Sequence, residues 1–225
     1  MNPGTPHFDS FAQQLRASIQ GKQAHATTLN LAKHNHVYRC GDPGRQIYFV
    51  ETGHIKLLGL SRSGKECLMN ICGPGDVFGE SCLTGAERRE TATTMTAVVL
   101  KQISAAHFLT LLEQNHLLPD YVMYLAERSA QQNTLITDLA TTNSEYRLGA
   151  ALLRLGHKLG HKDLHSWRIG QRISHQELSD MVGTTRPRIS EFMHRFHRLG
   201  LIQTTPESWL IVMEPRLAAY MRAAR

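Results

Sequence analysis

The sequence predicts an α+β chain made of an antiparallel β-roll, one long helix and a C-terminal group of short helices and strands. Three observations predict this arrangement. Short apolar runs separated by glycine turns fill residues 27–103, a helical heptad pattern spans residues 119–143, and two short helical patterns joined by a glycine occupy residues 174–202. A β-rich part, a long helix and a helical part therefore follow one another along the chain.

The expected boundaries are residues 1–117 for the roll, 118–144 for the long helix with its hinge, and 145–225 for the C-terminal domain. With 225 residues, of which 41% are hydrophobic, the chain is long enough to bury a sizeable core. Residues 141–225 hold 13 Lys and Arg against 7 Asp and Glu, whereas residues 1–140 hold 12 against 12. The net charge of +6 therefore lies in the C-terminal part, as expected for a module attracted to phosphate.

Membrane association is not predicted. No apolar run approaches the roughly eighteen residues that a membrane span requires, and residues 1–10 contain no signal-peptide core. We therefore expect a cytoplasmic protein without a membrane partner. The cytoplasm keeps thiols reduced, so we expect free, mostly buried cysteines at Cys40, Cys67, Cys72 and Cys82.

The β-roll follows a short helix expected over residues 8–19. Its strands are predicted from four short apolar runs at residues 47–50, 54–58, 67–71 and 97–100. The turns between them are predicted from glycine-containing segments at residues 41–44, 53, 63–65 and 73–76. Short strands at such regular spacing favour an antiparallel roll or barrel.

The long helix carries a seam of residues spaced by three and four. The seam consists of Val122, Leu125, Ser129, Gln132, Ile136, Leu139 and Asn143. Such a seam implies a partner helix, most simply the same helix of a second copy. Buried polar residues are costly unless paired, so Ser129 and Gln132 would pair across a dimer, meet a ligand or fix the helical register.

A hinge is expected over residues 143–147, followed by a helix over residues 147–159. The buried stripe of that helix is predicted to be Leu148, Ala151, Leu152 and Leu155. Ser174 and Glu177 then form an S-x-x-E capping box, in which each side chain satisfies an amide of the first helical turn. The helix that begins there should bury Leu178, Met181 and Val182 and should end at Gly183.

A second short helix is expected directly after this glycine. Thr184 or Thr185 can cap it, and Pro187 falls in its first turn, where a missing N–H costs little. Its apolar side is predicted to be Ile189, Phe192, Met193, Phe196 and Leu199. Its outer side is predicted to be polar and rich in arginine, as in the second helix of a helix-turn-helix, which enters the DNA major groove.

The alternative for these two helices is an αα-hairpin with a solvated basic face. Two β-like runs at residues 201–202 and 209–212 bracket a turn over residues 204–208 and predict a hairpin after the second helix. This hairpin favours a winged helix-turn-helix over the simple αα-hairpin.

The chain resembles the Crp/Fnr family of bacterial transcription regulators. Residues 173–202 are similar to the DNA-binding domain of that family, above all in VGTTRPRIS followed by RLGLI. The segments GDPGRQIYFVETGHIKLL, SGKE and GPGDVFGESCL are similar to its cyclic-nucleotide-binding roll, a cupin-like double-stranded β-helix. The resemblance implies a homodimeric, sequence-specific DNA-binding regulator controlled through the roll, with double-stranded DNA and RNA polymerase as partners.

The DNA contacts are expected on the second helix of the motif. Arginine binds guanine or phosphate with two hydrogen bonds, and we expect these contacts from Arg186, Arg188 and Arg195. Residues expected at base edges or at the phosphate backbone are Ser190, Glu191, His194, Thr185 and Gln176. The family often has glutamate at the position of Pro187 and arginine at that of Glu191. The operator should therefore differ from the best-known site of the family.

The resemblance implies an effector pocket around residues 78–92 for cAMP or cGMP. It assigns phosphate, ribose and base contacts to Gly79, Glu80, Ser81, Arg88, Arg89, Gln132 and Asn133, with Arg89 as the phosphate arginine in an alternative register. The family usually follows the arginine with a small hydroxyl residue and alanine, whereas this chain has Arg89 and Glu90. A carboxylate beside the phosphate would repel it. A roll without cyclic nucleotide, or with another effector, is therefore the alternative.

Other chemistry is weakly supported by the sequence. No nucleophile elbow, P-loop or metal-hydrolase helix is present, so an enzyme is not predicted. The first cysteine is Cys40, which argues against the N-terminal iron–sulfur cluster of some family members. His34 with His36, or His157, His161 and His165 at helical spacing, could bind a metal such as zinc, but 13 histidines make such coincidences common, and no metal site is predicted. Haem ligation stays open, as does a cyclic-nucleotide-binding module that does not bind DNA.

Overall fold

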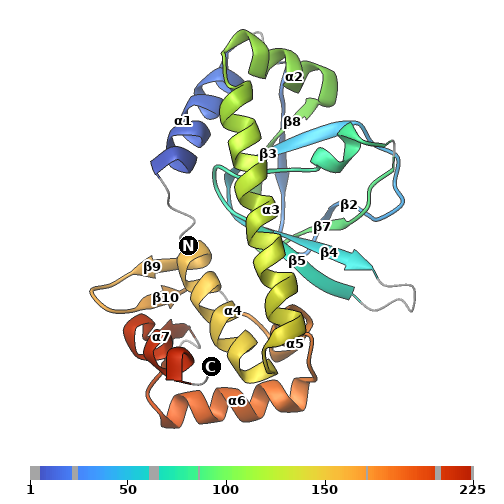
Figure 1. Cartoon of the computed structure of the whole chain (residues 1–225). Coiled ribbons are helices and arrows are strands. Elements are labelled where there is room, and N and C mark those ends of the chain that lie inside the picture. The colour runs from blue at the N-terminus through green and yellow to red at the C-terminus, as the bar shows by residue number, and fades with distance from the viewer. Residues whose placement is uncertain are drawn as a thin grey trace. The chain divides into compact units, whose positions relative to one another are not determined.

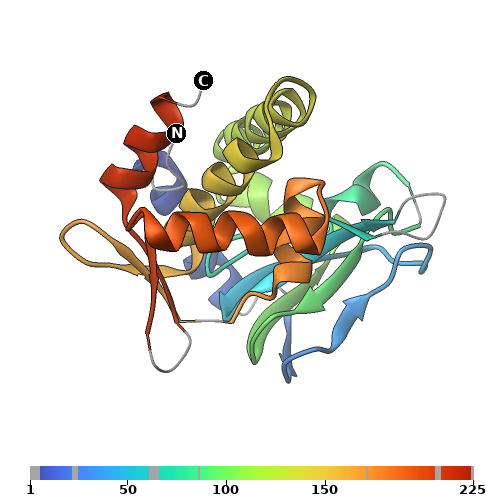
Figure 2. The same ribbon diagram turned by 90° about the horizontal axis from the view of Figure 1, so that it is seen from below.

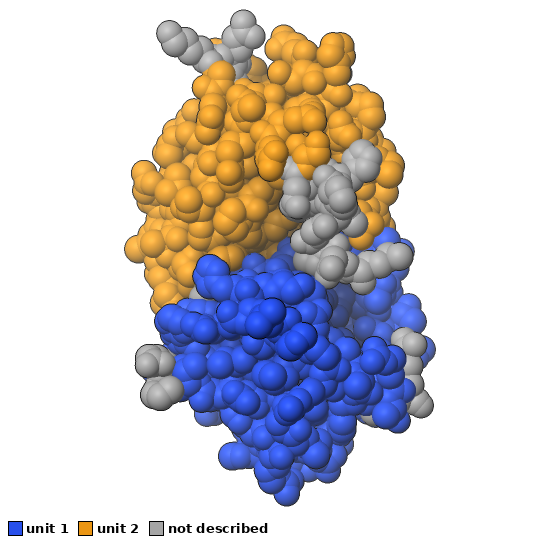
Figure 3. Space-filling model, turned by 90° about the vertical axis from the view of Figure 1, so that its left-hand side faces the viewer, with its two compact units in different colours: residues 1–3, 130–225 blue, residues 4–129 orange. Residues whose placement is uncertain are grey.

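The computed structural model describes residues 6–21, 25–60, 66–85, 87–170, 172–205 and 209–223. The chain forms two compact units, one of residues 4–129 and one that contains residues 130–225 (Figure 3). The boundary falls within the long helix α3 (Leu118–Thr141), which was predicted over residues 119–143. The predicted α+β arrangement of roll, long helix and helical C-terminal domain is confirmed (Figure 1).

The first unit contains two four-stranded antiparallel sheets in its described residues, with strand orders β1-β8-β3-β6 and β2-β7-β4-β5. The strands are β1 (Thr27–Leu31), β2 (His36–Tyr38), β3 (Gln46–Thr52), β4 (Ile55–Leu60), β5 (Glu66–Cys72), β6 (Val77–Phe78), β7 (Thr91–Thr94) and β8 (Val98–Ser104). The four apolar runs of the sequence all fall in or overlap strands, namely β3, β4, β5 and β8. The predicted turn at residues 63–65 lies outside the described residues.

Strand β3 explains why a continuous apolar run forms the centre of this unit. Successive side chains of a strand point to opposite faces. Ile47 and Phe49 enter a core shared with the helices, while Tyr48 and Val50 enter the core inside the roll. All four are at most 5% exposed, so the strand is buried on both faces.

Three helices pack on one face of the roll: α1 (Pro6–Gln20), α2 (Ala105–Gln114) and the first half of α3. Helix α1 was predicted over residues 8–19, but α2 was not predicted. Strands β1, β2, β6 and β7 were also missed, because their sequences are polar or very short. In β7, for example, buried Thr94 donates its hydroxyl to the carbonyl of Ala32 at 2.7 Å.

The second unit contains the rest of the helices and a four-stranded sheet of order β11-β12-β10-β9. Its elements are α4 (Ser144–Leu159), β9 (Gly160–Lys162), β10 (Trp167–Ile169), α5 (His175–Val182), α6 (Arg186–Arg198), β11 (Ile202–Thr204), β12 (Leu210–Val212) and α7 (Glu214–Ala223). The predicted hairpin is confirmed as β11 and β12, although residues 206–208 of its turn lie outside the described residues. Strands β9 and β10, which extend this sheet, were not predicted.

Two local predictions of secondary structure were wrong. The helix expected over residues 147–159 already begins at Ser144, because the Asn143 side chain caps α4 by accepting from the Tyr146 amide at 2.8 Å. Only residues 142 and 143 separate α3 from α4. The spacing of His157, His161 and His165 is not helical, because α4 ends at Leu159 and His161 belongs to β9.

Candidate functional site

The α5–turn–α6 motif is built as its sequence predicts. The Ser174 hydroxyl accepts from the Glu177 amide at 3.1 Å, and the Glu177 carboxylate accepts from the Ser174 amide at 3.0 Å. Gly183 ends α5 with a φ of 67°, a left-handed conformation that glycine adopts without strain. Thr185 precedes α6 without a side-chain capping bond, and Pro187 lies in the first turn. The capping box and the glycine therefore fix the turn between the two helices.

Helix α6 is buried on one side and open on the other. Ile189, Phe192 and Phe196 are at most 8% exposed. Leu199, expected on the same side, is 50% exposed because it is the C-cap residue beyond the last helical turn. Exposed side chains of the outer side are Arg186, Pro187, Arg188, Glu191, His194 and Arg198. Figure 2 shows α6 running along the surface of its unit.

Several predicted DNA-contact residues have partners within the protein. The Ser190 hydroxyl lies 2.8 Å from His175 Nδ1 and donates to the Arg186 carbonyl at 3.2 Å. Gln176 Nε2 donates to Asp180 at 2.9 Å. Arg195 forms an ion pair with Glu145 of α4 at 2.9 Å. Arg186, Arg188, Glu191 and His194 are thus the predicted residues that α6 exposes most directly.

The predicted effector pocket surrounds the 3-10 turn η2 (Glu80–Leu83) and is organised by Arg88. Arg88 is 3% exposed and donates to the carbonyls of Gly79 at 2.8 Å and Gln46 at 2.6 Å. Its guanidinium carbon lies 4.2 Å from the centre of the Tyr38 ring. Gly79 has a φ of 85°, and a Cβ there would lie 2.9 Å from Arg88 Nη1. The glycine therefore makes room for Arg88, and the buried guanidinium holds the turn.

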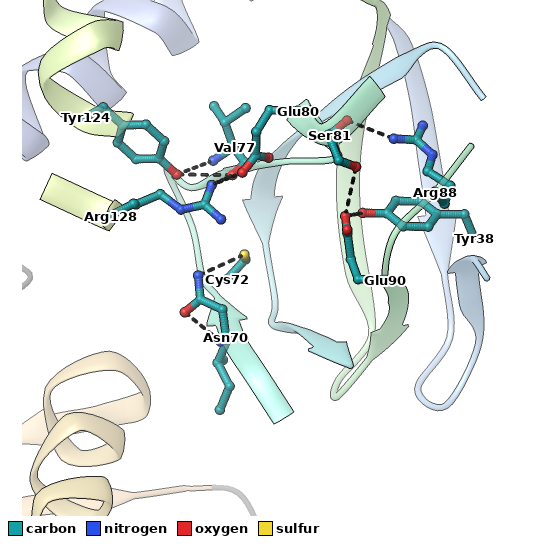
Figure 4. A network of polar contacts seen from close by, with 12 residues as sticks. Tyr38, Asn70, Cys72, Val77, Glu80, Ser81, Arg88, Glu90, Tyr124 and Arg128 are labelled. Carbon is teal, nitrogen blue, oxygen red and sulfur yellow. Dashed lines mark hydrogen bonds and ion pairs between the residues drawn. The ribbon is translucent and has the colours of Figure 1, made fainter. Parts of the chain in front are cut away.

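Glu80, expected at a ribose, forms an ion pair with Arg128 of α3 at 2.7 Å (Figure 4). Burial raises the pKa of Glu80, and Arg128 opposes that rise by stabilising the carboxylate. Arg128 also donates to the Val77 carbonyl at 2.9 Å, and the hydroxyl of Tyr124 bonds both polar backbone atoms of Val77 at 3.1 Å. The first half of α3 is therefore tied to the pocket.

Glu90 is one of the two residues, with Arg89, at which this chain departs from the family pattern. One oxygen of its carboxylate accepts from the Tyr38 hydroxyl at 2.8 Å and from the Ser81 hydroxyl at 3.4 Å (Figure 4). Burial, followed by the charge of Glu90, raises the pKa of Tyr38 well above its ordinary value. The Glu90 carboxylate thus accepts hydrogen bonds from two hydroxyls of the protein itself.

The other predicted pocket residues take no part in the hydrogen bonds and ion pair of this network. Arg89 is exposed beside the buried Arg88. Gln132 and Asn133 are exposed on α3, in the part that belongs to the second unit. Sequence reasoning missed Tyr38, Tyr124 and Arg128, which build much of the network. Arg128 could have been suspected, because it follows Tyr124 by one helical turn beside the seam.

The seam of α3 is open to solvent over most of its length. Val122 is 56% exposed, Ile136 63% and Leu139 49%. Leu125 is partly buried against the helical core of the first unit, and Ser129 is exposed. The described part of the chain therefore leaves several apolar side chains at seam spacing largely exposed.

The remaining chemical groups do not assemble into a further site. Cys40 and Cys67 are exposed, against the expectation of mostly buried thiols, while Cys72 and Cys82 are buried. Among the described residues, no three His, Cys, Asp or Glu side chains are grouped so as to hold a metal ion. In the same residues, no helix combines the length and the apolar character needed to cross a bilayer.

Family models match both parts of the chain. A model described as a cyclic nucleotide-binding domain matches residues 28–115, and a model described as a Crp-like helix-turn-helix domain matches residues 146–220. The two matched segments contain the η2 pocket and the α5–α6 motif, respectively.

Curated relatives match over most of their length. The CRP-like cAMP-activated global transcriptional regulator of Mycobacterium tuberculosis is 27% identical over 190 residues, which cover 83% of this chain and 84% of that protein. The cyclic AMP receptor protein of Thermus thermophilus is 27% identical over 172 residues, 76% of each chain.

Solved structures show the same fold. The c-di-GMP responsive global regulator CLP of Xanthomonas campestris has a TM-score of 0.73 and 21% identity, with coverage of 88% of this chain and 99% of that one. A transcriptional regulator of the CRP/FNR family from Thermus thermophilus has a TM-score of 0.70 and 24% identity, with coverage of 88% and 100%.

Proposed function

Because the chain belongs to the Crp/Fnr family of DNA-binding transcription regulators, we propose that it acts as a homodimer whose two α6 helices enter major grooves of double-stranded DNA. The observation that carries this proposal is the two-sided character of α6. Its buried side fixes the helix in the unit, while Arg186, Arg188 and Arg198 extend from the open side. The basic charge of residues 141–225 draws this face to phosphate.

Individual contacts follow from side-chain chemistry. Arg186 and Arg188, at the N-terminal end of α6, can each bind a guanine edge or a phosphate with two hydrogen bonds. Glu191 accepts from the amino group of cytosine, and His194 lies one turn further along the exposed side. Thr185, Ser190 and Gln176 are available to the backbone or to base edges. Pro187 has no side-chain hydrogen-bonding group, so the base pair that it would face is not recognised by a hydrogen bond from this residue.

The dimer is inferred from the open seam of α3. Val122 and Ile136 are 14 residues apart, which is two heptads, Leu139 follows Ile136 by three, and all three side chains are about half exposed or more. Pairing this helix with that of a second copy would cover them. A two-fold dimer would then read two half-sites of opposite orientation one helical turn apart. RNA polymerase is the further partner expected of such a regulator.

For control through the roll, the geometry favours a regulator that does not use cAMP or cGMP, the ligands expected for such a domain. Arg88 is engaged by two backbone carbonyls, and Glu80 is engaged by Arg128. Glu90 accepts a hydrogen bond from the hydroxyl of Ser81, one of the residues expected to contact the nucleotide. An anion entering here would displace these bonds and approach a carboxylate.

DNA recognition is tested by selecting bound sequences from a random duplex library with the full-length protein. We expect an inverted repeat with half-sites about 10 base pairs apart, centre to centre. Repeating the selection with Glu191→Arg should change the preferred base at one position of each half-site from cytosine to guanine. The matched control is Arg222→Ala, which alters an exposed arginine of α7 and should leave the selected sequence unchanged. Selection of no common sequence by the wild-type protein would contradict the proposal.

A further inference from the structure

Arg195 and Glu145 form the most complete ion pair near the open face of α6. Arg195 Nη1 donates to both carboxylate oxygens of Glu145, at 2.9 and 3.2 Å. The Tyr220 hydroxyl donates to one of the same oxygens at 2.8 Å. The carboxylate therefore joins α6 to α4 and α7 through three hydrogen bonds.

Glu145 is held in place by its own helix and by Tyr220. It lies in the first turn of α4, where the helix dipole favours a carboxylate, and its side chain is 19% exposed. The hydrogen bond and the charge of Glu145 raise the pKa of Arg195. Tyr220 is fixed in turn by an edge-to-face contact with Phe196, whose ring centre is 5.7 Å away. The Glu145 carboxylate is thus held by its own helix and by Tyr220, in addition to its ion pair with Arg195.

Arg195 nevertheless lies beside the residues that face DNA. It follows Arg188 by seven residues and Glu191 by four, so the three side chains form one row along α6. Its side chain is 44% exposed, whereas that of Glu145 is largely covered. A guanidinium in this row would reach a phosphate if its acceptor within the protein were removed.

We propose that the ion pair with Glu145 keeps Arg195 from contacting DNA and fixes the C-terminal half of α6. Arg195 is then a positioning residue, and Glu145 sets the number of phosphate contacts that α6 makes. The proposal rests on DNA binding by α6, as proposed above. The proposal gives Arg195 and Arg188 different roles, although the two arginines lie in the same row of the helix.

The test is the salt dependence of binding to a mixed-sequence duplex of 30 base pairs, measured by fluorescence anisotropy with the full-length protein. Each phosphate contact contributes about −0.9 to the slope of log affinity against log salt concentration. We expect Arg195→Gln to leave the wild-type slope unchanged. Glu145→Gln should make the slope steeper by about 0.9 and tighten binding several-fold at 50 mM salt, because Arg195 is released. Arg188→Ala should make the slope shallower by about 0.9.

The outcomes separate this proposal from the proposed function. A shallower slope for Arg195→Gln, equal to that for Arg188→Ala, would show a direct phosphate contact and overturn the proposal. An unchanged slope for a folded Glu145→Gln would overturn it as well. If circular dichroism shows that Glu145→Gln is unfolded, the slope measured for Arg195→Gln alone tests the proposal. If the wild-type protein binds without salt dependence, the proposed function itself fails and this inference fails with it.

Discussion

The Tyr38 hydroxyl donates to the Glu90 carboxylate at 2.8 Å, across the 52 residues that separate them in the chain. Tyr38 also supports the guanidinium of Arg88 on its ring. The two residues after Arg88 in the sequence, Arg89 and Glu90, therefore face different environments, one exposed and one built into the pocket. Residues that resemble an anion site by their sequence pattern are bonded to groups of the protein itself, Ser81 to Glu90 and Arg88 to two backbone carbonyls.

Replacing Glu90 should create affinity for a cyclic nucleotide. We expect no saturable heat when cAMP or cGMP is titrated into the wild-type protein, because the Glu90 carboxylate repels the phosphate and accepts a hydrogen bond from the Ser81 hydroxyl. Glu90→Ser removes that charge and frees a hydroxyl donor, so binding should tighten at least tenfold, or by about 1.4 kcal/mol. Glu87→Ser, which removes a neighbouring exposed carboxylate, is the control and should resemble the wild type. Saturable wild-type binding in calorimetry would contradict this expectation.

The adjacent arginines should differ strongly in their effect on stability. Arg88→Ala removes two hydrogen bonds from a buried guanidinium and leaves two carbonyls without these donors, so the free energy of unfolding should fall by about 2–4 kcal/mol. Arg89→Ala changes an exposed side chain, and its effect should stay within about 0.5 kcal/mol. Urea denaturation monitored by circular dichroism measures both. Equal losses for the two variants would rule out the structural role of Arg88.

Elements with local signals could be predicted from the sequence. The capping box at Ser174 and Glu177 and the left-handed Gly183 are determined by residues a few positions apart, and the turn formed as predicted. Asn143 shows the limit of such reasoning. Its place at the end of the seam suggested a hinge, yet the same side chain is a good N-cap and begins α4. A residue with two local roles cannot be assigned from the chain alone.

The partners within the candidate site could not be predicted, because they are distant in sequence. Arg195 and Glu145 are 50 residues apart, and Arg88 is 42 residues from the Gln46 carbonyl that accepts its hydrogen bond. No local pattern links such positions. The residue types at Arg88 and Arg195 indicated anion binding, but the fold supplied acceptors within the protein for both.

A charge placed in the α3 seam should prevent dimer formation. Ile136→Lys introduces a cation where two seams would meet, and an unpaired charge is costly to bury there. The wild-type protein should sediment at twice the chain mass of 25.3 kDa, and the variant at that mass. Thr134→Lys, an exposed change on the other side of the helix, should leave the dimer intact. Sedimentation equilibrium distinguishes these cases, and a dimeric Ile136→Lys protein would exclude the seam as the interface.

The contact between α5 and α6 should weaken in mild acid. Burial lowers the pKa of His175 from its ordinary value of 6.5, and Arg186 and His194 lower it further. Because folding disfavours the protonated form of a histidine whose pKa is lowered, the stability that it contributes is present above pH 6.5 and is lost as pH falls below that value.

The wild-type protein should therefore lose more thermal stability between pH 7.5 and pH 5.5 than His175→Gln, whose amide can also reach Ser190 but does not titrate. Differential scanning fluorimetry at the two pH values measures the difference. Other titrating groups, including His157, act equally in both proteins and cancel in the comparison. Equal losses in the two proteins would mean that His175 titrates near its ordinary pKa and that the His175–Ser190 contact does not depend on its charge.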